Sequence, residues 1–352
     1  MDRTLQNIGT SEVRPSHRFD VPRLEDWMRR EVEGFAGPLR VEQFKGGQSN
    51  PTYKLVTPER SYVLRRKPPG ALLPGAHAVD REYRVVTALG SRGFPVPRTY
   101  GLCLADEVIG TAFYVMEMVE GRIFWEPTFP QVPAADRPAY FDAMNAAIAK
   151  LHLIDPDAAG LSDYGKPGNY FGRQIARWSK QYRQDVEAGR VAAMDRLVEW
   201  LPAHIPPSEP EPRIIHGDFR CDNMIFHPGR PEVLAVLDWE LSTLGHPLAD
   251  FSYHLMMYRL PEALAEADLA ALNIPSEADY VAAYCRRTGR DGIADLDFYI
   301  AFNLFRLAGI VHGIKGRLAR GTAASAHAAE MAKRLEPLAE LGWEQAKRAG
   351  AR

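Results

Sequence analysis

The order of hydrophobic and polar residues gives the two ends of this chain a different character. Up to about residue 18 the sequence is polar and without a period, which predicts a mobile tail. Short alternating stretches then predict strands, and apolar residues three and four positions apart predict helices between them. The strands are expected at 39–44, 51–56, 60–66, 101–104 and 111–121, and the helices at 23–35 and 77–89.

Beyond residue 121 the helical spacing dominates. Helices are expected at 139–154, 170–188, 194–201, 249–259, 278–287, 295–318 and 325–348. In the first of these, His152 is expected to be a packed, hydrogen-bonded core histidine. The apolar runs 224–226 and 234–237 instead predict a hairpin, because a Pro-Gly segment separates them. The whole pattern predicts an α+β fold, with a tail at 1–18, a small β-rich N-terminal lobe at 19–118 and a larger helical C-terminal lobe at 119–352.

The composition narrows the class of protein. The chain has 352 residues, 46% hydrophobic and 25% charged, which is enough for two lobes. A net charge of −2 gives no general attraction to nucleic acid or to anionic membranes. The three cysteines lack metal-binding spacing, and we expect neither a signal peptide nor a membrane span. These features favour a cytoplasmic protein.

The strongest chemical signal lies in a polar loop between two short apolar strands. His216 and Asp218 are followed by Asn223, and Asp238 ends the second strand of the hairpin. An aspartate can accept a hydroxyl proton, and an asparagine carbonyl with a further carboxylate can bind Mg²⁺. The hairpin should bring Asn223 and Asp238 close together, as one metal site requires. This spacing is the catalytic-loop pattern of phosphoryl-transfer enzymes.

The stretch resembles the aminoglycoside phosphotransferase (choline-kinase-like) branch of the protein-kinase-like fold. The resemblance implies an ATP- and Mg²⁺-dependent phosphotransferase in which Asp218 is the catalytic base and His216 braces the loop. Arg220 stands where protein kinases carry a lysine that touches the γ-phosphate, although a salt bridge to Asp222 is an equal alternative. Asp250 matches the family's structural brace for the catalytic loop.

The same resemblance assigns a nucleotide site to the N-terminal lobe. Arg65 stands in place of the phosphate-binding lysine, with Arg66 or Lys67 as alternatives if the register slips, and Glu82 is its expected ion-pair partner. A glycine turn would cover the phosphates, and the end of the strand at 111–121 would hold the adenine. The remaining residues assigned to nucleotide binding are Gly46, Gly47, Ser49, Asn50, Met116, Glu117 and Val119.

The charges of the C-terminal lobe bear on the substrate. Segment 166–183 holds five basic residues and no acid, and segment 298–329 carries Arg306 inside an apolar run together with Lys315, Arg317 and Arg320. A solvated basic face is one explanation, and an anionic substrate is the other. The residues expected to bind it are Tyr170, Arg173, Arg177, Trp178 and Arg306.

These segments resemble the kinase-like domain fused to some acyl-CoA dehydrogenases, and its stand-alone bacterial relatives. That resemblance implies a hydroxyacyl-CoA thioester as the small-molecule substrate, with no nucleic acid or membrane partner. Two alternatives remain open. The chain could phosphorylate an aminoglycoside, choline or a sugar, or it could be a non-catalytic module that binds a nucleotide or a CoA ester. The oligomeric state does not follow from the sequence.

Overall fold

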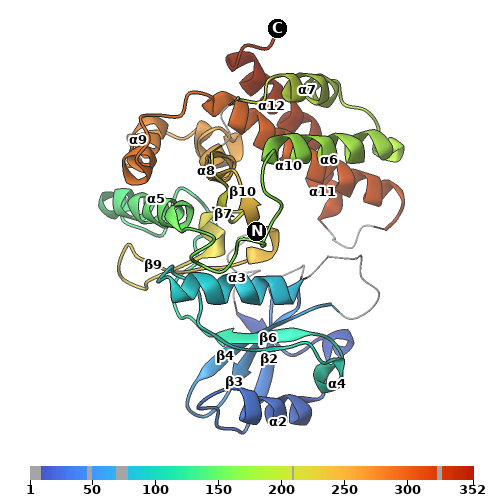
Figure 1. Ribbon diagram of the computed structural model, residues 1–352, viewed down its shortest axis with the longest axis vertical. Coiled ribbons are helices and arrows are strands. Elements are labelled where there is room, and N and C mark those ends of the chain that lie inside the picture. Colours follow the sequence, from blue (N-terminus) through green and yellow to red (C-terminus); the bar gives the residue numbers. More distant parts are fainter. Residues whose placement is uncertain (1–8, 46–49, 69–77, 208–209, 323–326) are drawn as a thin grey trace. The chain divides into compact units, whose positions relative to one another are not determined.

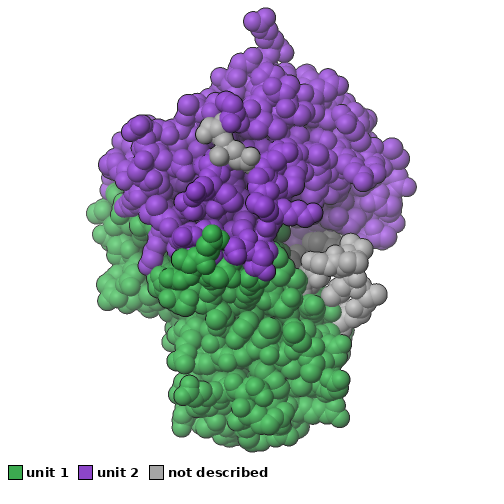
Figure 2. All heavy atoms as spheres, in the orientation of Figure 1, with its two compact units in different colours: residues 1–147, 157–161, 220–242 green, residues 148–156, 162–219, 243–352 purple. Residues whose placement is uncertain are grey.

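The computed structural model describes residues 9–45, 50–68, 78–207, 210–322 and 327–352. The chain forms two compact units: unit 1 comprises 1–147, 157–161 and 220–242, and unit 2 comprises 148–156, 162–219 and 243–352 (Figure 2). Strands concentrate in unit 1 and helices in unit 2, which confirms the predicted α+β fold. Among the described residues, no helix is both long enough and apolar enough to cross a membrane.

Unit 1 is built on a six-stranded antiparallel sheet of order β1-β2-β3-β4-β6-β5 (Figure 1). Part of the segment expected to be a tail belongs to it, because the strand β1 pairs with β2 and a 3-10 turn follows at Pro15–His17. The strands are β1 (Thr10–Ser11), β2 (Arg40–Phe44), β3 (Thr52–Val56), β4 (Ser61–Arg66), β5 (Thr99–Cys103) and β6 (Phe113–Glu117). The helices of this region are α2 (Val21–Glu31), α3 (Val79–Ser91) and the short α4 (Asp106–Ile109).

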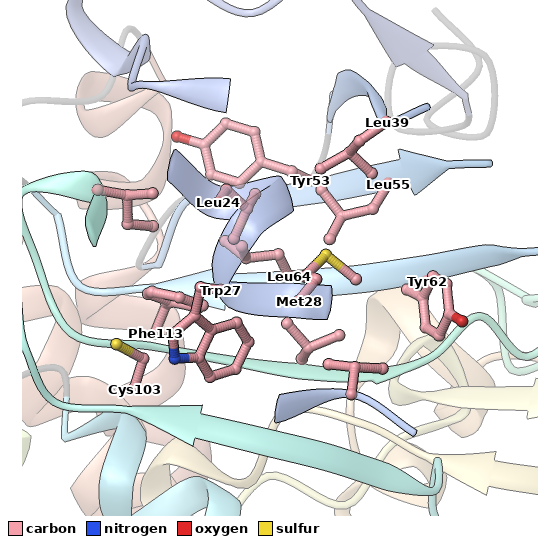
Figure 3. Packing of buried hydrophobic residues seen from close by; sticks show 13 residues of the cluster. Leu24, Trp27, Met28, Leu39, Tyr53, Leu55, Tyr62, Leu64, Cys103 and Phe113 are labelled. Carbon is pink, nitrogen blue, oxygen red and sulfur yellow. The ribbon is translucent and has the colours of Figure 1, made fainter. Parts of the chain in front are cut away.

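The alternation along the central strands gives the sheet two different apolar faces. One face packs on α2 (Figure 3), through Tyr62 and Leu64 of β4, Phe113 and Val115 of β6, and Leu24, Trp27 and Met28 of the helix. The other face packs on the start of α3, through Val63, Tyr114, Met116 and Val79. Because side chains alternate, neighbouring residues of β4 point to opposite faces of the sheet.

The predicted hairpin is present as β8 (Met224–Phe226) and β9 (Val233–Val236), and it groups with unit 1. Backbone hydrogen bonds explain this grouping. The Val236 N–H donates to the Pro95 carbonyl at 2.9 Å, and Arg122 and Phe226 exchange two bonds of 2.8 Å. The turn after β9 (Trp239–Leu241) packs against α3, and its Trp239 ring meets the ring of Phe94, just past the end of α3, edge to face. These contacts fix the position of Asp238 relative to the sheet.

Unit 2 is mainly helical, with one short strand pair, β7 (Arg213–Ile215) and β10 (Thr243–Gly245), among its described residues. The predicted helix at 325–348 is two helices within its described part, and the one at 249–259 ends earlier and continues as a 3-10 turn. The helices are α6 (Tyr170–Gln184), α7 (Ala192–Ala203), α8 (Pro247–Leu255), α9 (Glu277–Thr288), α10 (Leu296–Ala319), α11 (Ala328–Ala332) and α12 (Leu335–Arg348). The helix α5 (Arg137–Leu153) begins in unit 1 and ends in unit 2.

We expect Leu64→Ala to destabilise the protein by about 2–5 kcal/mol, since a fully buried leucine leaves a cavity in the sheet–α2 core. Urea unfolding would measure the change. Leu104→Ala is the matched control, because Leu104 is 62% exposed and its truncation should change the free energy of unfolding very little. Equal losses from both variants would contradict this account of the core.

Candidate active site

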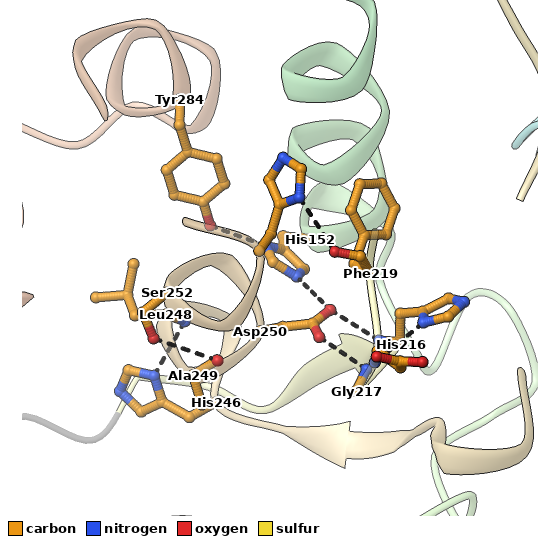
Figure 4. Close-up of polar contacts among 12 residues, drawn as sticks. His152, His216, Gly217, Phe219, His246, Leu248, Ala249, Asp250, Ser252 and Tyr284 are labelled. Atoms are coloured by element: carbon orange, nitrogen blue, oxygen red, sulfur yellow. Dashed lines mark hydrogen bonds and ion pairs between the residues drawn. The ribbon is translucent and has the colours of Figure 1, made fainter. Parts of the chain in front are cut away.

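A single buried carboxylate, that of Asp250 in α8, holds the start of the polar loop (Figure 4). Its Oδ2 accepts the N–H of His216 at 2.8 Å, and its Oδ1 accepts the N–H of Gly217 at 2.7 Å. The ring of His152 lies 3.2 Å from Oδ2 through Nε2, and its Nδ1 lies 2.8 Å from the hydroxyl of Tyr284. These are the contacts expected of a loop brace at Asp250 and of a hydrogen-bonded core histidine at His152.

The environment of Asp250 keeps it ionised. Burial by itself would raise the pKa of this carboxyl group, but the hydrogen bond and charge of His152, followed by His216, outweigh burial and lower it. A buried carboxylate that accepts backbone N–H groups is favoured in its charged form. The brace therefore operates at neutral pH.

The catalytic-base candidate, Asp218, has a partner that the sequence did not indicate. The hydroxyl of Tyr253, in α8, donates to its Oδ1 at 2.5 Å. The Asp218 N–H donates to Nδ1 of His216 at 3.2 Å, the contact expected if His216 braces the loop. Arg306 donates to the Gly217 carbonyl at 2.9 Å, and its guanidinium lies 5.3 Å from the centroid of the Tyr253 ring. Different side chains thus hold the two parts of this loop: Arg306 binds its backbone at Gly217, and Tyr253 binds the carboxylate of Asp218.

In unit 1, the guanidinium of Arg65 joins three carboxylates. Its Nε lies 2.7 Å from Glu82 Oε2, so the predicted ion pair is present. Its Nη2 donates to Asp238 Oδ1 at 2.7 Å and lies 3.6 Å from Glu240 Oε2. Burial would lower the pKa of Arg65, but the attraction of Glu82 and the other anionic groups raises it overall. One guanidinium thus gathers the carboxylates of Glu82, Asp238 and Glu240 around it.

Strand alternation selects Arg65 over its neighbour for this position. Arg66 points to the α2 face, where its guanidinium lies 5.3 Å from the ring centroid of Phe19 and 5.7 Å from that of Tyr53. One of its nitrogens also donates to the Ile109 carbonyl at 3.4 Å. Because Arg66 is committed to that core, Arg65 is the arginine of β4 that faces Glu82.

The chemistry of Asn223 and Asp238 fits a hard divalent cation. The Leu237 N–H donates to the Asn223 carbonyl at 2.8 Å, so the hairpin brings the backbones of the two sites together. Asp238 adopts a left-handed conformation with φ 64°, which an aspartate tolerates better than most residues. Both side chains offer oxygen, and Mg²⁺ commonly binds one or two protein carboxylates together with substrate phosphates. The carboxylate of Glu240, which lies near the same guanidinium as Asp238, adds to the anionic character that suits such an ion.

The other residues assigned to nucleotide binding have mixed positions. Gly46, Gly47 and Ser49 lie outside the described residues. The buried Asn50 amide donates to Glu82 Oε1 at 2.9 Å, and Met116 packs in the α3-facing core. Glu117 ends β6, where its N–H donates to the Arg98 carbonyl at 2.8 Å. Val119 lies two residues beyond the end of that strand.

The basic residues divide by their contacts. Arg220 lies 3.1 Å from Asp222, which is the salt bridge considered as its alternative. Arg173 donates to the carbonyls of Pro167 and Lys166 at 3.1 and 2.7 Å, and so closes the loop before α6. Arg177 is exposed, and its guanidinium lies over the ring of Trp178 at 5.3 Å. The ring of Tyr170 packs near Phe302 of α10.

Two residues of this arrangement have no assignment from the sequence. Tyr253 lies on α8, outside the loop pattern, and Glu240 is an ordinary acid in the turn after Asp238. The one available signal for Tyr253 is its place three residues after Asp250, because residues three apart share a helix face. A spacing of three residues from another polar residue is too common in helices to have identified Tyr253 from the sequence.

The antiparallel sheet with its Arg65–Glu82 pair, the braced His-x-Asp loop and the following hairpin define a phosphotransferase of the protein-kinase-like fold. The chain belongs to the phosphotransferase enzyme family, whose family profile matches residues 40–288. A solved structure from Ralstonia eutropha, provisionally named an aminoglycoside phosphotransferase, is 53% identical with a TM-score of 0.87. That match covers 94% of this chain and 99% of the other.

Other relatives are longer or more distant. Acyl-CoA dehydrogenase family member 10 of Mus musculus is 41% identical across 98% of this chain and 33% of its own length. Family member 11 of Gallus gallus is 45% identical across 97% of this chain and 45% of its own length. The chain thus spans less than half of these relatives. Aminoglycoside phosphotransferase APH(4)-Ia with ADP and hygromycin B shares the fold, at 13% identity and a TM-score of 0.62 over 93% of this chain and 98% of that one.

We expect Asp250→Asn to destabilise the protein by about 1–3 kcal/mol at pH 7, because the amide offers one acceptor oxygen where the carboxylate offers two. The folded-state pKa of Asp250 is lowered, so its contribution is present above the unfolded pKa of about 3.9 and is lost as the pH falls through the folded value. The deficit of the variant should therefore shrink below about pH 4.

Urea unfolding across this pH range would measure the effect of Asp250→Asn. The exposed Asp136 supplies the matched Asp136→Asn control, which should leave the free energy of unfolding nearly unchanged. A deficit that stays constant with pH would contradict the ionised state of Asp250.

Proposed function

We propose that this chain is an ATP- and Mg²⁺-dependent phosphotransferase that phosphorylates a hydroxyl group of a hydroxyacyl-CoA thioester. The observation that carries the proposal is the braced loop, in which Tyr253 orients Asp218 while Asp250 fixes the backbone of the two preceding residues. A base must be held within reach of the proton that it accepts. The family membership supports the phosphotransferase chemistry.

In this proposal unit 1 binds the nucleotide. Arg65 contacts the phosphates, and its ion pair with Glu82 keeps the guanidinium in place when the nucleotide leaves. Asn223 and Asp238 would hold Mg²⁺, which would neutralise phosphate charge. Arg binds phosphate oxygens as a planar fork, so its presence in place of lysine suits two-point contact. The end of β6 would receive the adenine through backbone groups.

Asp218 then accepts the proton of the substrate hydroxyl while the hydroxyl oxygen bonds to the γ-phosphorus of ATP, and ADP leaves with the electron pair of the broken P–O bond. Tyr253 binds Oδ1 of the carboxylate and so orients the base. Most of the rate enhancement in such reactions comes from position and charge neutralisation rather than from covalent chemistry. The hydrogen bond from Arg306 to the Gly217 carbonyl helps to hold the backbone next to Asp218 in position.

The proposed acceptor rests on charge and on the relatives. Helix α6 carries no acid, and among the described residues the side chains of Arg177 and Lys180 form no ion pair with a carboxylate. Such a surface suits an anion rather than a polycationic aminoglycoside. The acyl-CoA dehydrogenase names of the 41–45% identical relatives point to a CoA thioester as that anion.

The test is Mg-ATP consumption by the purified protein with 3-, 4- and 5-hydroxyacyl-CoA thioesters, and with kanamycin and choline as comparators. ADP release that depends on a CoA thioester alone would support the proposal. Turnover only with kanamycin or choline would keep the phosphotransferase and overturn the acceptor. Nucleotide binding without turnover on any of these compounds would favour the non-catalytic module.

We expect Asp218→Ala to lower turnover by about 10²–10⁴-fold, the usual contribution of a positioned general base. Nucleotide binding, measured by calorimetry with AMP-PNP, should stay close to that of the unmodified chain, because Arg65, Asn223 and Asp238 are intact. Unchanged turnover would remove Asp218 from the role of the base.

Tyr253→Phe should lower kcat by about 10–100-fold, because one hydrogen bond to a charged group contributes about 1.5–3 kcal/mol. The phenyl ring remains available to Arg306, and KM for ATP should not change. Steady-state kinetics would separate the two constants. A rise in KM for ATP with kcat intact would show that Tyr253 acts on nucleotide binding and not through Asp218.

A further inference from the structure

Helices α6 and α10 pack against each other (Figure 1), and the order of their contacts shows that they run in the same direction. Their contacts advance together along both helices: Tyr170 meets Phe302, Trp178 lies over Gly309, and Asp185 lies over Gly316. The glycines permit this close approach, since a Cβ at position 309 would lie 3.2 Å from the Trp178 ring. A Cβ at position 316 would overlap the Asp185 carboxylate outright. The pair therefore forms one continuous two-helix surface within unit 2.

One end of this helix pair adjoins the catalytic loop. Arg306 of α10 donates to the carbonyl of Gly217, the residue before Asp218. Tyr170 begins α6, and its ring lies against Gly245 of β10, the strand that pairs with β7 just before the loop. From Arg306 to Arg320 the chain rises by about 21 Å (14 residues at about 1.5 Å each), which sets the distance to the other end of the pair.

The other end of the pair forms an open groove of about 560 Å³. Its lining includes Arg177, Lys180, Gln184, Asp185, Val186 and Arg320. Asp185 is already neutralised in part, because Arg320 binds both of its oxygens at 2.7 and 3.1 Å, and Arg320 also reaches the lining residue Glu187 at 3.2 Å. The hydrogen bond from Arg320, ahead of burial, lowers the pKa of Asp185, so these partners stay charged.

The opposite wall of the groove is cationic and available. Arg177 and Lys180 are exposed, and among the described residues neither side chain is paired with a carboxylate. Arg177, Lys180 and Gln184 follow one another at three- and four-residue steps, so they share one face of α6. Val186 is 78% exposed at the rim and offers an apolar contact beside these cations. Cations, amides and a small apolar surface together are what a phosphorylated nucleoside requires.

We propose that this groove binds the phosphorylated nucleoside end of coenzyme A, with Arg177 and Lys180 contacting its phosphates and Val186 its adenine. The inference rests on the proposed function, and it adds a place for the end of the substrate that does not react. The pantetheine arm of CoA is a long extended chain, and it would follow the α6–α10 surface from the groove toward the loop. Substrate selection then occurs far from the reacting hydroxyl.

The test compares two thioesters of one hydroxyacyl group, one on CoA and one on pantetheine, with Lys180→Glu as the variant. Removing a charge-assisted phosphate contact and adding a repulsive charge should raise KM for the CoA thioester by about tenfold or more. KM for the pantetheine thioester, and kcat for both, should not change. Arg286→Glu, an exposed arginine of α9 outside the groove, is the matched control and should alter neither thioester.

The outcomes separate this inference from the proposed function. If the unmodified chain uses the CoA thioester but Lys180→Glu changes neither KM, or changes both equally, the groove assignment is overturned and the function stands. If the chain uses no thioester, the proposed function fails. Calorimetry with free CoA in saturating Mg-AMP-PNP then tests whether the groove binds CoA. Weaker CoA binding by Lys180→Glu than by Arg286→Glu would support the assignment, and equal binding would overturn it.

Discussion

The buried carboxylate of Asp250 is the constraint on which unit 2 depends. It accepts two consecutive backbone N–H groups of the catalytic loop and pairs with His152 of α5, which in turn contacts Tyr284 of α9. A buried charge is costly unless its hydrogen bonds are satisfied, so all of these elements must keep their places together. Asp218 is the next residue of this loop. Its position therefore depends on the packing of the helices α5, α8 and α9.

In unit 1 the main constraint is a buried cation, that of Arg65, to which the proposed function assigns phosphate binding. The side chain of Arg65 is largely buried, and Glu82, Asp238 and Glu240 compensate its charge. Breaking a buried ion pair by removing one partner commonly costs about 3–5 kcal/mol, so the network ties β4, α3 and the hairpin to one another. An incoming phosphate and a divalent cation would exchange partners within this set of charges rather than create a site from separate residues.

The glycines of α10 connect packing with specificity. Gly309 and Gly316 have no side chain to separate α10 from α6, and the contact that results places Arg320, just after α10, in one groove with Arg177 and Lys180 of α6. Larger residues there would separate the helices. The basic residues that favour an anion in the sequence thus gather in one groove only through the packing of α6 on α10.

Local pattern determined the strands β2 to β6, the hairpin, the long helices and the polar loop, because strand alternation, helical spacing and motif spacing are properties of short stretches. It did not predict the short strands β7 and β10 or the short helix α4. The resemblance to the aminoglycoside phosphotransferase branch, which the catalytic-loop motif carries, brought Arg65 and Glu82 into one prediction, and the ion pair is present. The tail was expected to be mobile, yet Thr10–Ser11 pairs with β2, a long-range contact that no local period encodes. The partners that only the tertiary structure decided include Tyr253 on Asp218, Arg306 on Gly217 and Asp185 on Arg320. Each of these contacts joins residues that are far apart in the chain. Which polar groups meet is therefore decided by how the helices and strands pack, and local sequence does not encode that.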